Sequence, residues 1–123
     1  MFFKPRHTIP LVLALATLGA VHAQPRESGG ILTDAAGFTL YVFDNDLTVP
    51  GKSVCINACA LSWVHLAAKE ADKPQGDHTI IVRDDGQKQW VYKGRPLYRF
   101  VNDKKPGDQL ADGMRGAWHV AKP

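Results

Sequence analysis

Leu40-Tyr41-Val42-Phe43-Asp44-Asn45-Asp46 returns later in the chain as Leu97-Tyr98-Arg99-Phe100-Val101-Asn102-Asp103. Both copies read Leu-Tyr-x-Phe-x-x-Asp, and they stand fifty-seven residues apart, from position 40 to position 97. Each copy is followed by a Pro-Gly turn, at residues 50–51 and 106–107. Self-similarity of this kind predicts two similar structural units.

The two aromatic side chains of each motif should share one face of a strand, because side chains alternate along an extended chain. Tyr41 and Phe43 then point one way, as do Tyr98 and Phe100, while Arg99 lies on the opposite face. We expect the Tyr/Phe face to form the shared core, because aromatic residues at a period of two fill small β cores. The alternative is a stacking surface for a sugar or an aromatic ligand. The same two interpretations apply to the three tryptophans, Trp63, Trp90 and Trp118.

Asp46 and Asp103 end the two motifs just before a loop. A carboxylate at such a position accepts hydrogen bonds from backbone N–H groups and fixes the turn. The chemical alternative is a carboxylate pair for acid–base or glycosidase chemistry, formed by these two residues or by Asp84 with Asp85. Because every one of them sits at a turn signal, the structural interpretation is favoured.

Residues 1–23 are typical of a secretory signal peptide. Lys4, Arg6 and His7 form a basic start, an uncharged apolar run covers residues 9–21, and Ala23 ends the segment. The run is too short for a membrane span, and no cysteine follows it that could carry a lipid. We therefore predict cleavage near Ala23 and a periplasmic or secreted mature chain.

The remaining residues, 24–123, are enough for one domain. Two of the fifteen Lys and Arg residues and none of the twelve acids lie in the first 23 residues, so the rest carries a net charge of +1. This near-neutral balance does not predict nucleic acid or an anionic membrane as a partner.

The pattern beyond the signal predicts an antiparallel all-β domain of about six short strands, with a polar leader at 24–30 and a polar surface loop at 67–77. Asp85-Gly86 predicts a two-residue hairpin turn, and Lys93-Gly94 a second tight turn. One short helical piece, capped by Asn57, is expected over residues 57–63. The expected strands are 31–33, 38–43, 79–83, 89–92, 96–100 and 117–120.

Cys55 and Cys59 are the two cysteines of the chain. In an exported protein a disulfide is the default for such a pair, and its formation requires Cys55 to lie outside the helix. The alternative is a thiol pair that acts in redox chemistry, or that binds Cu(I) together with His65. His78 and His119 are isolated in the sequence and predict no catalytic triad.

Taken in order, these segments resemble a bacterial family of secreted repeats, also described as predicted lipoproteins with a Yx(F/W/Y)xxD motif. The resemblance covers nearly all of residues 24–123 and is carried by the two motifs and by four further stretches: Ser53–Ala60 followed by Trp63, Arg83–Gly86, Gln89–Tyr98 and Gly116–Val120. It implies a bacterial extracytoplasmic domain whose function is largely unknown, and it implies no catalytic residues.

The sequence therefore predicts a small antiparallel domain of two hairpin-based repeats, with motifs at 40–46 and 97–103 and one disulfide. We expect a non-enzymatic binding or interaction module without a cofactor, whose partner is a small molecule or a cell-envelope protein. The alternative is a copper-handling or thiol redox protein that uses Cys55 and Cys59.

Overall fold

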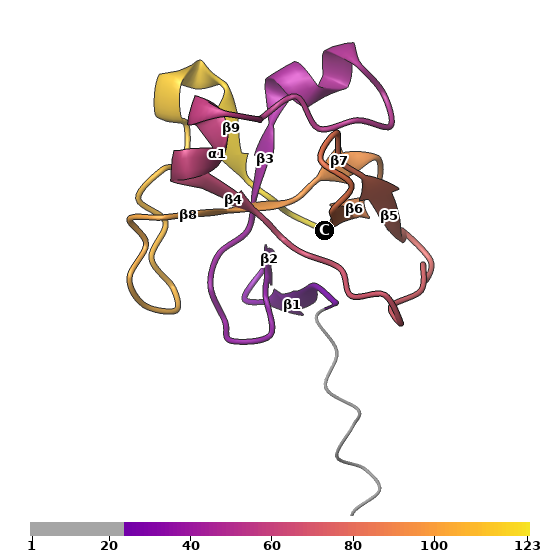
Figure 1. Cartoon of the computed structure of the whole chain (residues 1–123). Coiled ribbons are helices and arrows are strands. Elements are labelled where there is room, and N and C mark those ends of the chain that lie inside the picture. The colour runs from indigo at the N-terminus through magenta and orange to yellow at the C-terminus, as the bar shows by residue number, and fades with distance from the viewer. Residues whose placement is uncertain (1–23) are drawn as a thin grey trace, which may run out of the picture.

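The structure of the protein is a computed structural model that describes residues 24–123. The predicted signal peptide, residues 1–23, lies outside the described residues. Figure 1 shows three small sheets, with the helical turns gathered at one end and the β1–β2 hairpin at the other. The elements in chain order are β1 (Arg26–Ser28), β2 (Ile31–Thr33), β3 (Tyr41–Phe43), η2 (Asp44–Thr48), α1 (Ala58–Ser62), β4 (Trp63–His65), β5 (His78–Val82), β6 (Lys88–Tyr92), β7 (Arg95–Pro96), β8 (Tyr98–Phe100), η3 (Met114–Gly116) and β9 (Trp118–Val120).

The central sheet interleaves the two repeats, in the strand order β4-β8-β3-β9. β3 of the first repeat pairs with β9 of the second, and β8 of the second pairs with β4 of the first. β3 and β8 carry the two motifs and meet in the middle, where Tyr41 is opposite Tyr98. All of these pairings are antiparallel, so the sequence correctly predicted the class of fold. The exchange of strands between the repeats was not predicted.

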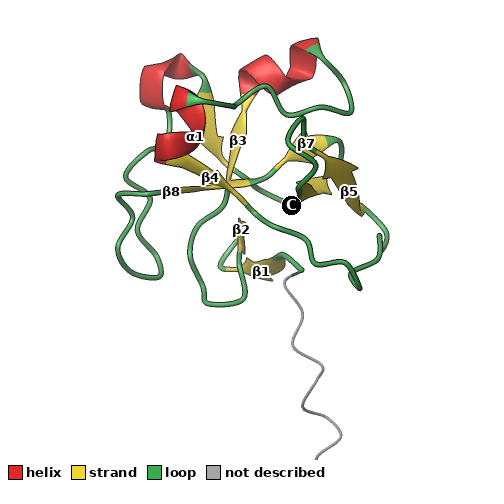
Figure 2. Ribbon diagram, viewed as in Figure 1, coloured by secondary structure: helices red, strands yellow, loops and turns green. Residues whose placement is uncertain are grey.

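A second sheet, β5-β6-β7, lies to one side of the central sheet (Figure 2). The β5–β6 connection is not the two-residue turn that we expected. Arg83 N–H bonds to the Gln87 carbonyl at 2.7 Å, which leaves a three-residue loop closed by Gly86 at a φ of 88°. Such loops place their third residue in the left-handed region, where glycine is favoured. The Lys93-Gly94 turn has the predicted two residues between Tyr92 and Arg95.

Two hydrophobic clusters fill the domain instead of one. The first surrounds the motif tyrosines and contains three aromatic residues beside them, Trp63, Phe100 and Trp118. The second lies on the opposite face of the motif strands and contains Leu32, Leu40, Leu66, Trp90, Leu97 and Ala121. The Tyr/Phe face is thus core, but so is the leucine face, because other segments cover the central sheet on both sides.

Four further local expectations were wrong. The expected strand 96–100 is divided at Leu97 between β7, in the second sheet, and β8, in the central sheet. The polar leader, in which no strand was expected, contains β1, which pairs with β2 over three residues. Trp63 begins strand β4 directly after α1 instead of ending a helix. Asn57 makes no side-chain cap, since its backbone takes a φ of 56°, outside the usual capping geometry.

Candidate functional site

The two motifs lock onto each other through reciprocal hydrogen bonds. Tyr41 Oη donates to Asp103 at 2.7 Å, and Tyr98 Oη donates to Asp46, also at 2.7 Å. All four side chains are buried. Each tyrosine therefore binds the aspartate of the other repeat, not the aspartate five residues further along its own motif.

Each motif aspartate also organises the loop that follows it. The second oxygen of Asp46 accepts the Val54 N–H at 2.7 Å, and that of Asp103 accepts the Leu110 N–H at 3.1 Å. One carboxylate thus ties its own loop to the tyrosine of the opposite repeat. Hydrogen bonds to an ionised, buried group are among the stronger ones in proteins.

Burial is the main influence on which group of each tyrosine–aspartate pair holds the proton. It raises the pKa of the Tyr41 and Tyr98 phenols, and the neighbouring carboxylates add to the rise, so both protons stay on the tyrosines. Burial also raises the pKa of the Asp46 carboxyl, against the hydrogen bonds from Val54 and Tyr98. The aspartates serve as hydrogen-bond acceptors within the fold.

An aromatic stack crosses between the repeats beside this lock. Trp63 and Trp118 occupy corresponding positions in the two repeats, and their rings lie parallel at 3.6 Å between centroids. Phe43 stacks on the outer side of this pair, 4.1 Å from Trp118, and Phe100 packs 4.7 Å from Trp63. Each motif phenylalanine therefore contacts the tryptophan of the other repeat.

A cleft of about 650 Å³ opens over this stack. Its walls come from corresponding parts of both repeats: Phe43, Asn45 and Trp63 from the first, and Phe100, Asn102 and Trp118 from the second. Cys59 with neighbouring residues of α1, and Met114 and Arg115 of η3, complete it. Its volume lies in the range of small-molecule sites.

The polar side chains at the rim of the cleft are exposed and make no polar contact with the rest of the described residues. Asn45, Asn102 and Arg115 are all exposed, and none of these side chains makes a hydrogen bond or ion pair with another described residue. Arg115 also has a φ of 54°, in the left-handed region that disfavours residues with a Cβ. Backbone strain of this kind is concentrated at functional positions.

The profile of a family described as a secreted repeat of unknown function matches residues 23–67 and 79–122, one repeat each. The chain belongs to this family. No curated protein and no solved structure matches it significantly. None of the helices in the described part of this secreted-repeat protein has the length and apolar run that a membrane span needs.

A polar network that joins the two repeats of this secreted-repeat protein surrounds Tyr98 and has no counterpart around Tyr41. Arg83 is buried and donates to Ser53 at 2.9 Å, to Gln89 at 2.7 Å and to the Cys55 carbonyl at 2.9 Å. Ser53 in turn lies 2.6 Å from the Tyr98 hydroxyl. This network could not be predicted from the sequence, because an arginine at the end of a strand ordinarily lies in solvent.

Cys55 and Cys59 are joined by the predicted disulfide, which closes the loop between Ser53 and α1.

His65, the third residue of the copper alternative, lies on strand β4 and not on an exposed loop. It is partly buried, and burial lowers the pKa of its imidazole. Residues 24–123 hold no group of three or more His, Cys, Asp or Glu side chains placed to bind a metal ion. Copper binding by the two sulfurs would require reduction first, since a disulfide has no thiolate to donate.

The structure also pairs residues that the sequence left isolated. His119 Nε2 lies 2.8 Å from Asp44, and Arg95 lies 3.0 Å from the other oxygen of that carboxylate. These contacts lower the pKa of Asp44, with the His119 hydrogen bond as the main cause. Asp84 forms an exposed ion pair with Lys52, and Asp85 accepts the Gln87 N–H within its turn. Seventy-five residues separate His119 from Asp44, so sequence spacing alone could not have found that pair.

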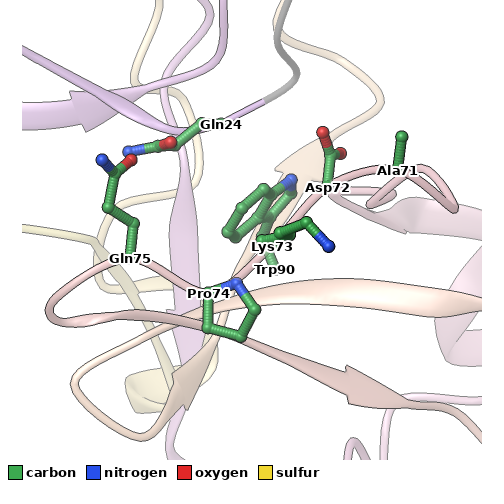
Figure 3. Close-up of a pocket in the computed structure, with 7 residues that line it drawn as sticks. All are labelled: Gln24, Ala71, Asp72, Lys73, Pro74, Gln75 and Trp90. Atoms are coloured by element: carbon green, nitrogen blue, oxygen red, sulfur yellow. The ribbon is translucent and has the colours of Figure 1, made fainter.

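A smaller hollow of about 300 Å³ lies where the segment between the repeats passes Trp90 (Figure 3). Gln24 and residues 71–75 line its mouth, and the Trp90 ring forms its back. Trp90 is buried, and its Nε1 has no hydrogen-bond partner among the described residues. Unlike the cleft, the hollow is lined mainly by the segment between the repeats, and Trp90 is its one aromatic side chain among the described residues.

Proposed function

We propose that this secreted-repeat domain is a non-enzymatic binding module and that the cleft over the Trp63–Trp118 stack receives the ligand. The observation that carries the proposal is the construction of the cleft. Its floor is made by the buried, stacked rings of Trp63 and Trp118, whereas its rim is made by exposed polar side chains that make no polar contact within the described residues. Ligand sites in proteins commonly combine such a preformed apolar floor with a few polar groups.

The chemistry of the rim favours a ligand that carries oxygen acceptors. Arg115 supplies guanidinium donors, Asn45 and Asn102 supply amide donors, and no carboxylate of residues 24–123 lines the cleft. The aromatic rings below favour an apolar body. A small molecule or the carboxyl end of an envelope protein segment, with an aromatic or aliphatic group next to a carboxylate, would satisfy both.

The roles of the carboxylates support a binding rather than a catalytic function. Asp46 and Asp103 are buried and engaged with the motif tyrosines and the loop backbones. Each therefore already has a structural role, and neither lines the cleft. The strained backbone at Arg115 supports a role for its guanidinium in holding a ligand.

A matched pair of compounds tests the ligand chemistry. N-acetyl-phenylalanine offers a ring, an amide carbonyl and a carboxylate, whereas phenethylamine offers the same ring with a cation. Nuclear magnetic resonance titration should show saturable shifts of the Trp63 and Trp118 indole signals with the first compound only. Changing Asn45 and Asn102 together to alanine should weaken binding by about tenfold or more. Gln109→Ala, an exposed amide outside the cleft, is the control. A response to both compounds alike, or to neither, would overturn this assignment.

Arg115→Gly separates function from stability. Glycine relieves the left-handed strain but is entropically costlier to order, so we expect a net gain of about 0.5–1 kcal/mol in the free energy of unfolding. The same change removes the guanidinium and should weaken binding of N-acetyl-phenylalanine. Urea denaturation and the titration above measure the two effects. Unchanged binding would contradict the role of the guanidinium in holding the ligand, and a clear loss of stability would mean that Arg115 has a structural role.

A further inference from the structure

The outer edge of β5 is an unpaired strand edge, and β5 lies at the outside of its sheet (Figure 1). Its five residues read His78-Thr79-Ile80-Ile81-Val82, without a lysine, a proline or a carboxylate. Proteins ordinarily protect exposed edges with such residues, because unpaired N–H and C=O groups attract another strand. The only β5 residue that another described segment covers on this side is His78, which exchanges two backbone hydrogen bonds with Gln75.

The hydrogen-bond alternation identifies the free groups. Antiparallel pairs alternate between bonded and non-bonded positions. Arg83 bonds to Gln87, so Val82, Ile80 and His78 stand at the non-bonded positions opposite β6. Trp90, the β6 residue opposite Ile80, supports this assignment. Its N–H and C=O bond to Leu66 and Leu97, on the side away from β5. Ile80 and Val82 therefore point four backbone groups outward, and no described segment pairs with them.

We propose that a second copy of this chain binds this edge, with the two β5 strands antiparallel about Ile81. In that register Ile80 faces the other copy's Val82 and Val82 faces the other copy's Ile80, so all four free groups of each copy are satisfied. Pairing Ile80 with itself would place Val82 opposite His78, whose groups Gln75 already occupies. Pairing Val82 with itself would place Ile80 opposite Asp84, which lies in the β5–β6 loop. The free groups are thus self-complementary in one register, as a two-fold interface requires.

The side chains of β5 and the low net charge of the chain also favour a second copy as the partner. Val82 is 56% exposed, and Ile80 and Ile81 are partly exposed, so apolar surface is buried when the strands meet. Residues 24–123 carry a net charge of only +1, which leaves little repulsion between copies. The resulting six-stranded sheet lies away from the cleft, which shares no residue with β5.

Analytical ultracentrifugation of the purified protein over micromolar to millimolar concentrations tests the dimer. We expect a reversible monomer–dimer equilibrium. Val82→Pro removes one outward N–H from each copy but no β5–β6 hydrogen bond, so it should weaken the dimer by about tenfold or more while the fold persists. Val64→Lys, an exposed valine on β4, is the control for surface changes, and Val82→Lys is a second variant in case proline disturbs β5.

Amide hydrogen exchange gives the position of the contact. The Ile80 and Val82 amides should exchange quickly in dilute protein and become protected as the dimer forms, whereas the Ile81 amide, bonded to β6, should be protected throughout. A protein that remains monomeric at millimolar concentration would overturn the proposal. So would a dimer in which the Ile80 and Val82 amides stay unprotected, or one that Val82→Pro and Val82→Lys leave unchanged. None of these results bears on ligand binding in the cleft.

Discussion

The Tyr98–Asp46 pair and the Tyr41–Asp103 pair are related by the internal repeat, yet their surroundings differ. Tyr98 also contacts Ser53, which connects it to the buried Arg83. The Tyr41 hydroxyl has only a long contact from the Ala111 N–H, at 3.4 Å, in addition to its aspartate. One pair therefore belongs to an extended polar network, whereas the other stands almost alone.

The loops that follow the two motifs differ in the same way. In the first repeat a disulfide closes the loop and Arg83 binds the Cys55 carbonyl. In the second repeat, the corresponding loop has no cysteine and ends in η3, where Gly113 before the element and Gly116 at its end both have positive φ. The parts that both repeats share hold the fold together, and the parts that differ shape the two walls of the cleft. The loop of the first repeat is crosslinked, whereas that of the second carries an arginine with a left-handed backbone.

The largest effect should come from the motif aspartates. Asp46→Ala leaves the Tyr98 hydroxyl and the Val54 N–H unsatisfied and removes the carboxylate that Tyr98 and Ser53 connect to the buried Arg83, so we expect a loss of about 3–4 kcal/mol. Asp103→Ala removes no carboxylate that is connected to Arg83, so it should lower the free energy of unfolding by only about 2–3 kcal/mol. Urea denaturation of both variants measures the difference. Equal losses would show that the network around Tyr98 adds nothing.

Opening the disulfide should have a smaller effect. Closing so short a loop stabilises by about 2 kcal/mol in the chain-entropy model, and the second repeat forms its loop without a crosslink. We therefore expect the reduced protein, and a Cys55→Ser/Cys59→Ser variant, to lose about 2 kcal/mol but to keep its near-ultraviolet circular dichroism. Complete unfolding on reduction would mean that the first loop cannot form by hydrogen bonds alone.

The smallest effect should be a pH dependence confined to the first repeat. His65 stands opposite Tyr98, where Val120 stands opposite Tyr41 in the other half. Burial and the charge of Arg83 lower the pKa of His65 in the folded state. The unfolded chain therefore takes up the proton first, and stability present above pH about 6.5 is lost as the pH falls through the lowered pKa. Thermal unfolding between pH 8 and pH 5 should show this loss, and His65→Val should reduce it. An identical loss in the variant would assign it to other groups.

Much of the fold could be predicted from the sequence, and the reason lies in local patterns. The repeat, the antiparallel class and most strand positions follow from alternation and turn residues, and export predicted the disulfide. β1 could not be predicted, because Arg26-Glu27-Ser28 has no apolar alternation. β4 was hidden because it begins without a turn residue after α1.

The exchange between the repeats could not be predicted, because the sequence of a repeated motif does not indicate whether its tyrosine binds the aspartate of its own copy or that of the other copy. Tyr41 lies five residues from Asp46 and sixty-two from Asp103, and spacing alone favours the nearer partner. The cleft could not be predicted for the same reason. Its residues were expected in the core or in loops, but only the pairing of β3 with β9 and of β4 with β8 brings them together.

Double-mutant cycles on Tyr41 test the exchange between the repeats most directly. Tyr41→Phe is combined once with Asp103→Ala and once with Asp46→Ala, and the free energies of unfolding are compared with those of the single variants. The interlocked arrangement predicts a coupling of about 1–2 kcal/mol for Tyr41 with Asp103, and additivity within about 0.5 kcal/mol for Tyr41 with Asp46. Coupling of Tyr41 to Asp46 instead, with none to Asp103, would mean that each motif closes on itself and would contradict the account.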